Sequence, residues 1–580
     1  TVTRTGTQVL TYTAAYDPNG AMTTEKLPGG ITVSHHVDEA GEEVGLTYAG
    51  QLTDPETGEV TTGDWIAWSQ TNDILGRVRT DQTTFASAIA TSAGILPDGG
   101  TTDGEMTEPT GGNPLDFDHR YTYDRSGNLA KVEDLTGTPV KGSDVSPYTV
   151  RDYTFTTNGA RATLKETIHA DGTPAGTATA GIDQTLTYDT ADRLTGGYVY
   201  DLLGRQTTLP AAHAPNPAGG DVQLGYFDND LPHKVAQGSM STTFTLDVAK
   251  RRLVQSSDTG GEVTTTTRHY TDSSDNPSWI ETKRPDGTTE TLRYTSSISG
   301  DLGASIATDG GVSLMLPNIH GDIATTIPIP AGTPATTPAT TITGWSSYTE
   351  YGTPIDPAQT ATVGTSAGYG WLGAKERSTT AETANLTLMG VRFYNRTTGA
   401  FTSVDPVPGG NNTAYNYPTD PINQTDTDGA KRNWQKWAKR IGAAASFGSL
   451  IPGPIGMIAT TISVGAFAAS GCWKCAAGAA VGFIPGAALA SKAAKSGRLI
   501  GKVARGAVAK QAKMKGIGVN SRLFGYHAKL NKGKFRIGWS NGRKKEGIVF
   551  RGAYRNRKLV TYRSGLKWNG PYGKRSSRRR

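Results

Sequence analysis

Tyr121-Thr-Tyr-Asp-Arg-Ser-Gly-Asn-Leu129 is the stretch of sequence that decides the fold. Side chains two residues apart on a β-strand point to the same face, so Tyr121 and Tyr123 share one face. Asp124 can start a turn by accepting hydrogen bonds from the backbone that follows it, and Gly127 supplies the positive φ that the next strand needs. The stretch therefore predicts a β-hairpin with an aromatic face.

The same plan recurs in the first 430 residues. Two further copies are Leu186-Thr-Tyr-Asp-Thr-Ala-Asp-Arg-Leu194 and Tyr198-Val-Tyr-Asp-Leu-Leu-Gly-Arg-Gln206, and weaker copies are Ala15-Tyr-Asp-Pro-Asn-Gly20, Asn72-Asp-Ile-Leu-Gly-Arg77 and Phe244-Thr-Leu-Asp-Val-Ala-Lys-Arg-Arg252. A single hairpin cannot bury its aromatic face, so copies must stack side by side into a continuous sheet. The repeats predict a mainly β protein.

These motifs resemble YD repeats, the units of rearrangement-hotspot (RHS) proteins, wall-associated toxins, insecticidal toxin-complex C subunits and teneurins. The resemblance implies a ribbon of β-hairpins that spirals into a hollow cocoon. It assigns residues 1–310 to this shell, which begins at Thr1 without a recognisable signal peptide, as expected for a cut through a longer protein.

A second set of motifs follows in residues 311–430 and resembles the RHS-associated core, the segment that closes the cocoon as a plug. The motifs occur in the family's order: His320-Gly-Asp322, Tyr348-Thr-Glu-Tyr-Gly352, Gly370-Trp-Leu-Gly373, Met389-Gly-Val-Arg-Phe-Tyr-Asn395, Thr398-Gly-Ala-Phe-Thr-Ser-Val-Asp-Pro406 and Asn412-Thr-Ala-Tyr-Asn-Tyr417.

The end of this core carries the residues that the resemblance implies for self-cleavage. Where the family has a second Asp-Pro-x-Gly-Leu, this chain has Asp426-Thr-Asp-Gly-Ala430. The family's aspartyl pair then corresponds to Asp405 and Asp426, with the cut between Ala430 and Lys431. Two carboxyls held close cannot both ionise, so one can act as an acid and the other as a base. The alternative is that both aspartates cap turns.

The charge changes sign at the same place. Residues 431–580 hold 33 Lys and Arg against a single acid, a net charge of +32, whereas residues 1–430 have a net charge of −26. Such asymmetry predicts a polyanionic partner for the basic part, either nucleic acid or an anionic membrane. The family resemblance implies that this part is a variable toxin cargo.

Residues 431–490 are predicted to be helical, rich in Gly and Ala, and almost uncharged between Ile441 and Ser491. Two interpretations compete, a membrane-inserting helical hairpin that aids delivery and a spacer folded inside the cocoon. The pair Cys472 and Cys475 lies in this segment, and its surroundings do not suggest a redox site.

Residues 491–580 are predicted to be a strongly basic toxin domain. A cationic helix is expected first, followed by a compact β-rich part in which residues 534–539 alternate between apolar and polar and Asn541-Gly542 supplies a two-residue hairpin turn. Basic and aromatic residues interleave there, a pattern typical of nucleic-acid binding. The candidate binding residues are Lys532, Lys534, Arg536, Arg543, Arg551 and Arg555.

The basic part of the chain has very few acidic residues and histidines, which limits the reactions that it could catalyse. Glu546 and His527 are the only acid and the only histidine after Asp428. A two-metal nuclease, a zinc deaminase and a glycosidase all need more such groups, so the sequence predicts neither a metal nor a cofactor. Metal-independent cleavage of RNA remains, with His527 or Glu546 as the base and Lys529 beside the phosphate.

The sequence therefore predicts a secreted or cell-surface toxin that cleaves itself after Ala430 and delivers a ribonuclease into rival cells. Its expected partners are tRNA or rRNA as substrate, a cognate acidic immunity protein, a delivery apparatus and an anionic membrane. Two other functions stay open, a membrane-permeabilising or translocation effector and a non-enzymatic wall-associated adhesion protein. The abrupt change of charge speaks against adhesion.

Overall fold

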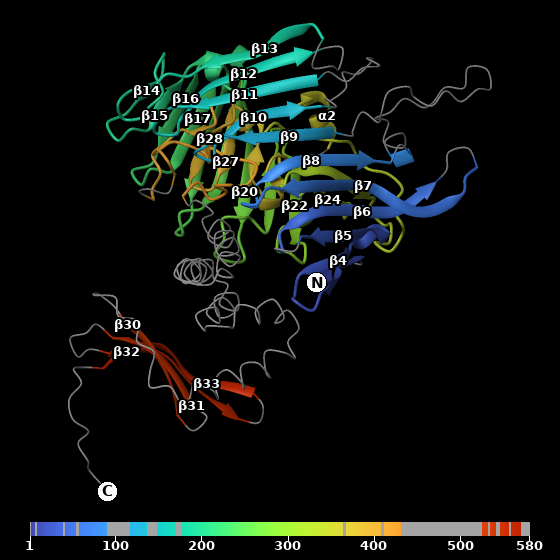
Figure 1. Ribbon diagram of the computed structural model, residues 1–580. Coiled ribbons are helices and arrows are strands. Elements are labelled where there is room, and N and C mark those ends of the chain that lie inside the picture. Colours follow the sequence, from blue (N-terminus) through green and yellow to red (C-terminus); the bar gives the residue numbers. More distant parts are fainter. Residues whose placement is uncertain are drawn as a thin grey trace. The chain divides into compact units, whose positions relative to one another are not determined.

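The computed structural model divides the chain into two compact units, Thr1–Trp434 and Gln435–Arg580. The structure describes residues 2–5, 8–38, 41–53, 57–86, 88–89, 117–135, 148–169, 176–363, 367–407 and 411–430 of the first unit. In the second it describes residues 525–531, 534–540, 546–555 and 558–569. The first unit is mainly β, as predicted, and is dominated by two large antiparallel sheets (Figure 1).

The first sheet has eleven strands, and each strand pairs with its neighbours in sequence. A separate two-stranded sheet, β1 (Val2–Thr5) and β2 (Gln8–Thr11), precedes it. The eleven strands are β3 (Thr13–Tyr16), β4 (Met22–Lys26), β5 (Thr32–Val37), β6 (Glu43–Thr53), β7 (Val60–Asn72), β8 (Val78–Phe85), β9 (Phe117–Tyr123), β10 (Leu129–Asp134), β11 (Tyr148–Phe155), β12 (Arg161–His169) and β13 (Ala178–Thr185).

The second sheet has twelve strands in the same sequential order. They are β14 (Val199–Tyr200), β15 (Gln206–Leu209), β16 (Val222–Tyr226), β17 (Pro232–Gln237), β18 (Met240–Leu246), β19 (Arg252–Thr259), β20 (Glu262–His269), β21 (Trp279–Lys283), β22 (Thr289–Ser296), β23 (Leu302–Ile306), β24 (Val312–Pro317) and β25 (Ile323–Ile329). The sheet thus continues past residue 310, and the chain leaves it only after Ile329.

The hairpin turns form as the repeats predict. Asp124 Oδ1 accepts hydrogen bonds from the backbone N–H groups of Ser126 and Asn128, at 2.8 and 2.9 Å, and Gly127 adopts a φ of 84°. Asp17, Asp73, Asp189, Asp201 and Asp247 make the same pair of backbone bonds. Tyr121 and Tyr123 pack into one apolar cluster, so the shared aromatic face is confirmed.

One copy of the repeat differs from the prediction of a full hairpin. Residues 186–194 form only the isolated bridge between Tyr188 and Leu194, and they lie in the chain between β13 and β14. Its glycine position is occupied by Asp192, which takes up a positive φ of 58°. The positive φ alone does not explain the missing strands, because Lys250 has a φ of 65° at the same position of the Asp247 turn, which joins the full strands β18 and β19. This copy is the connection between the two sheets.

The inner segment, residues 345–430, packs against both sheets. It holds a small four-stranded sheet of β26 (Ser378–Thr379), β27 (Thr387–Met389), β28 (Arg392–Asn395) and β29 (Ala400–Phe401). It also contains the short helix α2 (Pro357–Thr362) and 3₁₀ turns at Gly373–Lys375 and Ala381–Thr383. Three more 3₁₀ turns lie outside it, at Pro28–Gly30, Ala211–His213 and Pro217–Gly219.

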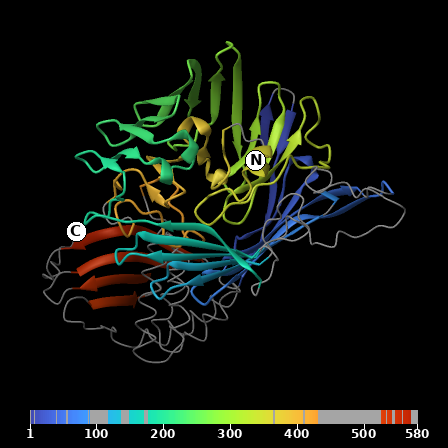
Figure 2. The same ribbon diagram turned by 90° about the horizontal axis from the view of Figure 1, so that it is seen from above.

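Two apolar clusters show how the inner segment is held. Trp371, Met389 and Tyr394 lie in one cluster with Leu129, Val132 and Leu164 of the first sheet. Leu386, Leu388 and Phe393 lie in another with Val222, Val235 and Phe244 of the second sheet. Figure 2 accordingly shows the orange strands of this segment between green and cyan strands of the two sheets. The inner segment therefore joins the two sheets through a shared core.

In the second unit, four strands form an antiparallel sheet in sequence order: β30 (Gly525–Asn531), β31 (Lys534–Ser540), β32 (Glu546–Arg555) and β33 (Lys558–Asn569). Ser540 of β31 pairs with Glu546 of β32, and the two-residue turn predicted at Asn541-Gly542 lies outside the described residues. The predicted apolar helical segment and basic helix lie outside the described residues. Within the described parts of the chain, no helix is long and apolar enough to cross a membrane.

Candidate functional site

Asp405 and Asp426 come together in the interior of the inner segment, where they are 7 % and 0 % exposed. The same two donors bind both carboxylates. Arg392 Nη2 donates to Asp405 Oδ2 at 3.0 Å and to Asp426 Oδ2 at 3.1 Å. Asn411 Nδ2 donates to the same two oxygens at 3.3 and 3.1 Å. The two Oδ2 atoms thus face one another across a shared pair of nitrogens.

The local backbone explains how these groups are held. Arg392 opens β28, and its guanidinium carbon lies 3.6 Å from the ring centroid of Phe401 in β29. Its Nη1 donates to the carbonyls of Ser403 and Ala414 at 3.5 and 3.3 Å. The backbone N–H of Asp405 donates to the Ala414 carbonyl at 2.8 Å. An aromatic ring and two backbone carbonyl groups therefore hold the guanidinium in the position in which it binds the carboxylates.

The electrostatic balance of the site is uneven, because one guanidinium serves two buried carboxyls. Burial raises the pKa of Asp426 to about 7, although Arg392 and Asn411 oppose the shift, and Asp428 and Asp405 add to it. Asp426 Oδ1 is buried without a hydrogen-bond partner. Burial also lowers the pKa of Arg392, against the pull of the two carboxylates. Near neutral pH, Asp426 is therefore poised to hold or release a proton.

The chain leaves the first unit beside this pair. The backbone N–H of Val391, next to Arg392, donates to the Asp428 carbonyl at 3.0 Å, and the N–H of Ala430 donates to Asp428 Oδ1 at 3.1 Å. Gly429 has a φ of 64°, and a Cβ there would collide with the Met389 carbonyl. A side chain at Gly390 would likewise collide with the Asp428 carbonyl. Residues 428–430 therefore run closely along the β27–β28 turn.

Turn capping accounts for only part of this arrangement. Asp405 Oδ1 does accept the backbone N–H of Val407 at 2.8 Å, as a turn-capping aspartate would. Its other oxygen, however, faces Arg392, and the hydrogen bonds of the Asp426 carboxylate run to the Arg392 and Asn411 side chains. The sequence prediction placed the two aspartates together and missed the two donors. A charged residue within the apolar run Val391-Arg-Phe-Tyr394 was the available signal, since a buried arginine requires partners.

The predicted cargo residues lie on separate strands of the second unit. His527 and Lys529 belong to β30, Lys534 and Arg536 to β31, and Glu546, Arg551 and Arg555 to β32. The register pairs Lys529 with Arg536 and Arg536 with Arg551. Lys431, Lys532 and Arg543 lie outside the described residues. In the parts that the structure does describe, no three His, Cys, Asp or Glu residues gather as a metal site would require.

Two large antiparallel sheets that pack against an inner segment with a buried aspartate pair define the class: a mainly β protein with a shared core between its sheets. Among solved structures, the fold is similar to that of a toxin complex, TcdB2-TccC3-Cdc42, with a TM-score of 0.52 and 15 % identity over 75 % of this chain. TcdB2-TccC3 itself matches with a TM-score of 0.46, 14 % identity and 73 % coverage. The matches span 20 % and 22 % of those chains, so this chain corresponds to about a fifth of their length. No family model and no curated protein matches.

Proposed function

We propose that this chain is part of a self-processing RHS-type toxin, in which residues 1–430 hold a basic effector and release it by cutting after Ala430. The buried Asp405–Asp426 pair beside residues 428–430 is the observation that carries the proposal. The fold likeness to a toxin complex supports it. Secretion or surface display, delivery into target cells and an acidic immunity protein belong to the same proposal.

The proposed reaction is hydrolysis of the peptide bond between Ala430 and Lys431. Protonated Asp426 donates a proton toward the Ala430 carbonyl oxygen while Asp405 removes a proton from the attacking water. As the tetrahedral intermediate collapses, Asp405 passes the proton it took from water to the Lys431 nitrogen, and Asp426 recovers a proton from a hydroxyl of the intermediate. The C–N bond breaks, leaving a carboxyl group on Ala430 and an amine on Lys431. Arg392 and Asn411 keep the two carboxyls within reach of one another.

Expression of the full chain tests the cleavage. Two fragments of unequal size should appear, and the smaller should begin at Lys431 by mass spectrometry. Asp426→Asn or Asp405→Asn should leave one intact chain. Asp201→Asn, which alters a turn aspartate on the second sheet, is the matched control and should be processed normally. An intact unmutated chain, or normal processing of both active-pair variants, would refute the assignment.

For the effector we propose metal-independent cleavage of RNA. The net charge of +32 supports a polyanionic substrate. The strand register supports it too, because four basic residues, Lys529, Arg536, Arg551 and Arg563, are successive cross-strand partners in the sheet. His527 lies two residues before Lys529 on the same strand, as the candidate base, and Glu546 is the other candidate.

The released fragment, taken from the self-processed chain, tests this activity. It should degrade total tRNA and rRNA in the presence of EDTA, and His527→Ala or Glu546→Gln should slow the reaction by roughly a hundredfold or more if that residue is the base. RNA that stays intact while anionic liposomes leak their dye would favour a membrane effector and refute the ribonuclease.

A further inference from the structure

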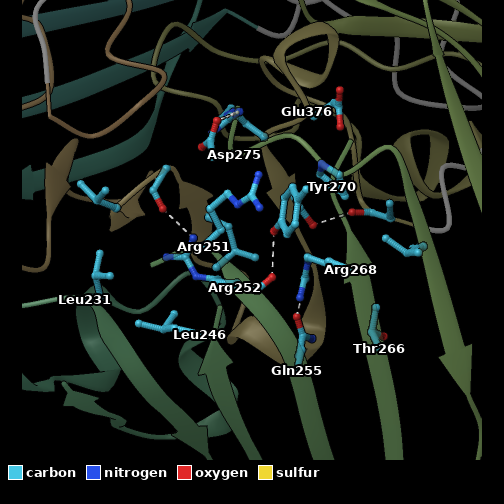
Figure 3. A pocket seen from close by; sticks show the side chains of 18 of the residues that line it. Leu231, Leu246, Arg251, Arg252, Gln255, Thr266, Arg268, Tyr270, Asp275 and Glu376 are labelled. Carbon is cyan, nitrogen blue, oxygen red and sulfur yellow. Dashed lines mark hydrogen bonds and ion pairs between the residues drawn. The ribbon is translucent and has the colours of Figure 1, made fainter. Parts of the chain in front are cut away.

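A cavity of about 590 Å³ lies between the second sheet and the inner segment. Arg252 and Arg268 come from β19 and β20, whereas Asp275 follows β20 and Glu376 belongs to the inner segment (Figure 3). The volume of the cavity falls within the usual range for small-molecule binding sites.

The wall contributed by the sheet is polar. Gln255 pairs with Thr266, Ser257 with Thr264, and Thr266 with Thr282, so side chains that share a face line the cavity in rows. Elsewhere the inner segment packs on apolar side chains of this sheet, such as Val222, Val235 and Phe244. The hydroxyl and amide groups of the wall are suited to a polar ligand.

Most of the positive charge around the cavity is neutralised by ion pairs. Arg251 pairs with Asp247, Arg284 with Glu290, Arg377 with Asp275, and Arg392 with the two aspartates of the candidate site. Arg252 and Arg268 form no ion pair with any residue that the structure describes. Arg252 Nη1 donates to the Gly390 carbonyl at 2.5 Å, and Arg268 Nη2 donates to Gln255 Oε1 at 2.8 Å.

The remaining donors of these two arginines have no partner. Nε and Nη2 of Arg252 and Nη1 of Arg268 are buried and make no hydrogen bond. A buried donor without an acceptor is unfavourable, and more so when it is charged. An acceptor that reaches both arginines, which lie on neighbouring strands, would relieve this penalty.

The surrounding charges reinforce this imbalance. Burial, followed by repulsion from Arg268, lowers the pKa of Arg252 to about 10, so Arg252 stays positive at neutral pH. Burial raises the pKa of Glu376 to about 8, which leaves this nearby carboxyl largely protonated and unable to act as its counter-ion. The cavity is therefore lined by two arginines that form no ion pair with any described residue.

We propose that this cavity binds a phosphate ester, with the phosphate dianion between Arg252 and Arg268 and the organic group against the ring of Tyr270, which also lines the cavity. A phosphate carries close to two negative charges at neutral pH, which matches the two cations. Its oxygens also suit the forked donors of a guanidinium. This binding site does not depend on the proposed self-cleavage.

Calorimetric titration of the full chain tests the site with three probes: inorganic phosphate, phenyl phosphate and acetate. Phenyl phosphate should bind, and it should bind more tightly than inorganic phosphate because its ring can pack against Tyr270. Acetate should not bind detectably. Equal binding of phenyl and inorganic phosphate would overturn the ester assignment, and no binding of either would overturn the site.

Substitutions locate the binding. Arg252→Gln or Arg268→Gln should weaken phenyl phosphate binding by roughly tenfold to a hundredfold, as expected for the loss of charge-assisted hydrogen bonds. Arg284→Gln is the matched control, because Arg284 lines the same cavity but is half exposed and paired with Glu290, and it should bind as the unmutated chain does. Arg252→Lys keeps the charge and should retain part of the affinity. Unchanged binding in well-folded Arg252→Gln and Arg268→Gln, judged by circular dichroism, would refute the assignment.

Discussion

Two buried clusters connect arginine to carboxylates in this molecule, and they differ in charge balance. In the first, Arg151 of β11 meets Glu350 of the inner segment in a bidentate pair, with Nη2 to Oε1 at 2.7 Å and Nε to Oε2 at 3.1 Å. The hydroxyl of Tyr153 donates to Glu350 Oε2 at 2.6 Å. In the second, the single guanidinium of Arg392 is shared by Asp405 and Asp426.

The difference appears in the pKa shifts. Burial by itself would raise the pKa of Glu350, yet the Arg151 charge and its hydrogen bonds outweigh burial and lower that pKa. For Asp426 burial prevails, and the pKa rises to about 7. One cation for one carboxylate gives a fixed ion pair, whereas one cation for two carboxylates leaves a proton to be shared. The first cluster is suited to holding the inner segment in place and the second to acid–base chemistry.

The substitution Asp426→Asn should have the largest effect, and that effect should be on the rate of self-cleavage. Asp426→Asn keeps the shape of the side chain and removes its acid–base function, so self-cleavage should slow by roughly a thousandfold or more. Time-resolved gel analysis of freshly synthesised chain measures the rate. Thermal unfolding should show that the variant stays folded. If Asp426→Asn cleaved itself within tenfold of the unmutated rate, the Asp405–Asp426 cluster would not be an acid–base site, and it would not differ in role from the Arg151–Glu350 pair.

Disruption of the balanced pair should affect stability instead. Glu350→Gln leaves the buried Arg151 charge uncompensated and should reduce the free energy of unfolding by about 3–5 kcal/mol. The double variant Arg151→Met with Glu350→Leu removes both charges and should lose much less. Urea unfolding of cleavage-deficient chains, each also carrying Asp426→Asn, compares the variants without loss of the cargo. If the single and double variants lost the same free energy of unfolding, the balance of charge would not be what stabilises this pair.

The pH dependence distinguishes the clusters further. Because the pKa of Asp426 is raised to about 7 in the folded state, the folded chain holds a proton between about pH 4 and 7 that the unfolded chain has lost. Stability should therefore fall as pH rises through this window, by an amount on the order of 4 kcal/mol from this group, and Asp426→Asn should remove that part of the slope. The reference is Glu350, whose lowered pKa works in the opposite direction: its contribution is lost as pH falls below about 4. Urea unfolding from about pH 2.5 to 8 measures both effects.

Contacts between residues close in sequence could be predicted, whereas contacts between distant residues could not. The hairpin turns follow from local chemistry, since Asp124 bonds to backbone groups two and four residues away. The aspartate pair was located by its resemblance to a known motif. Arg392 and Asn411 were missed, as were the paired Arg151 and Glu350, which lie 199 residues apart in sequence. Such contacts depend on how the inner segment docks between the sheets, and no local pattern encodes that docking. The unpaired Arg252 and Arg268 became apparent only when the strands were placed side by side.

A third kind of arginine–aspartate pair, on the turns, should have the smallest effect. Arg205 Nε donates to Asp201 Oδ2 at 2.6 Å, but both side chains are partly exposed, so water weakens the attraction. Asp201→Asn keeps the backbone bonds to Leu203 and Arg205 and should cost less than about 1 kcal/mol, whereas Asp201→Ala loses those bonds as well and should cost about 1 kcal/mol more. Urea unfolding in the Asp426→Asn background measures both. If Asp201→Asn destabilised the chain as much as Glu350→Gln, burial would not be what separates these pairs, and the distinction between balanced and shared charge would have to be sought in the fold around them.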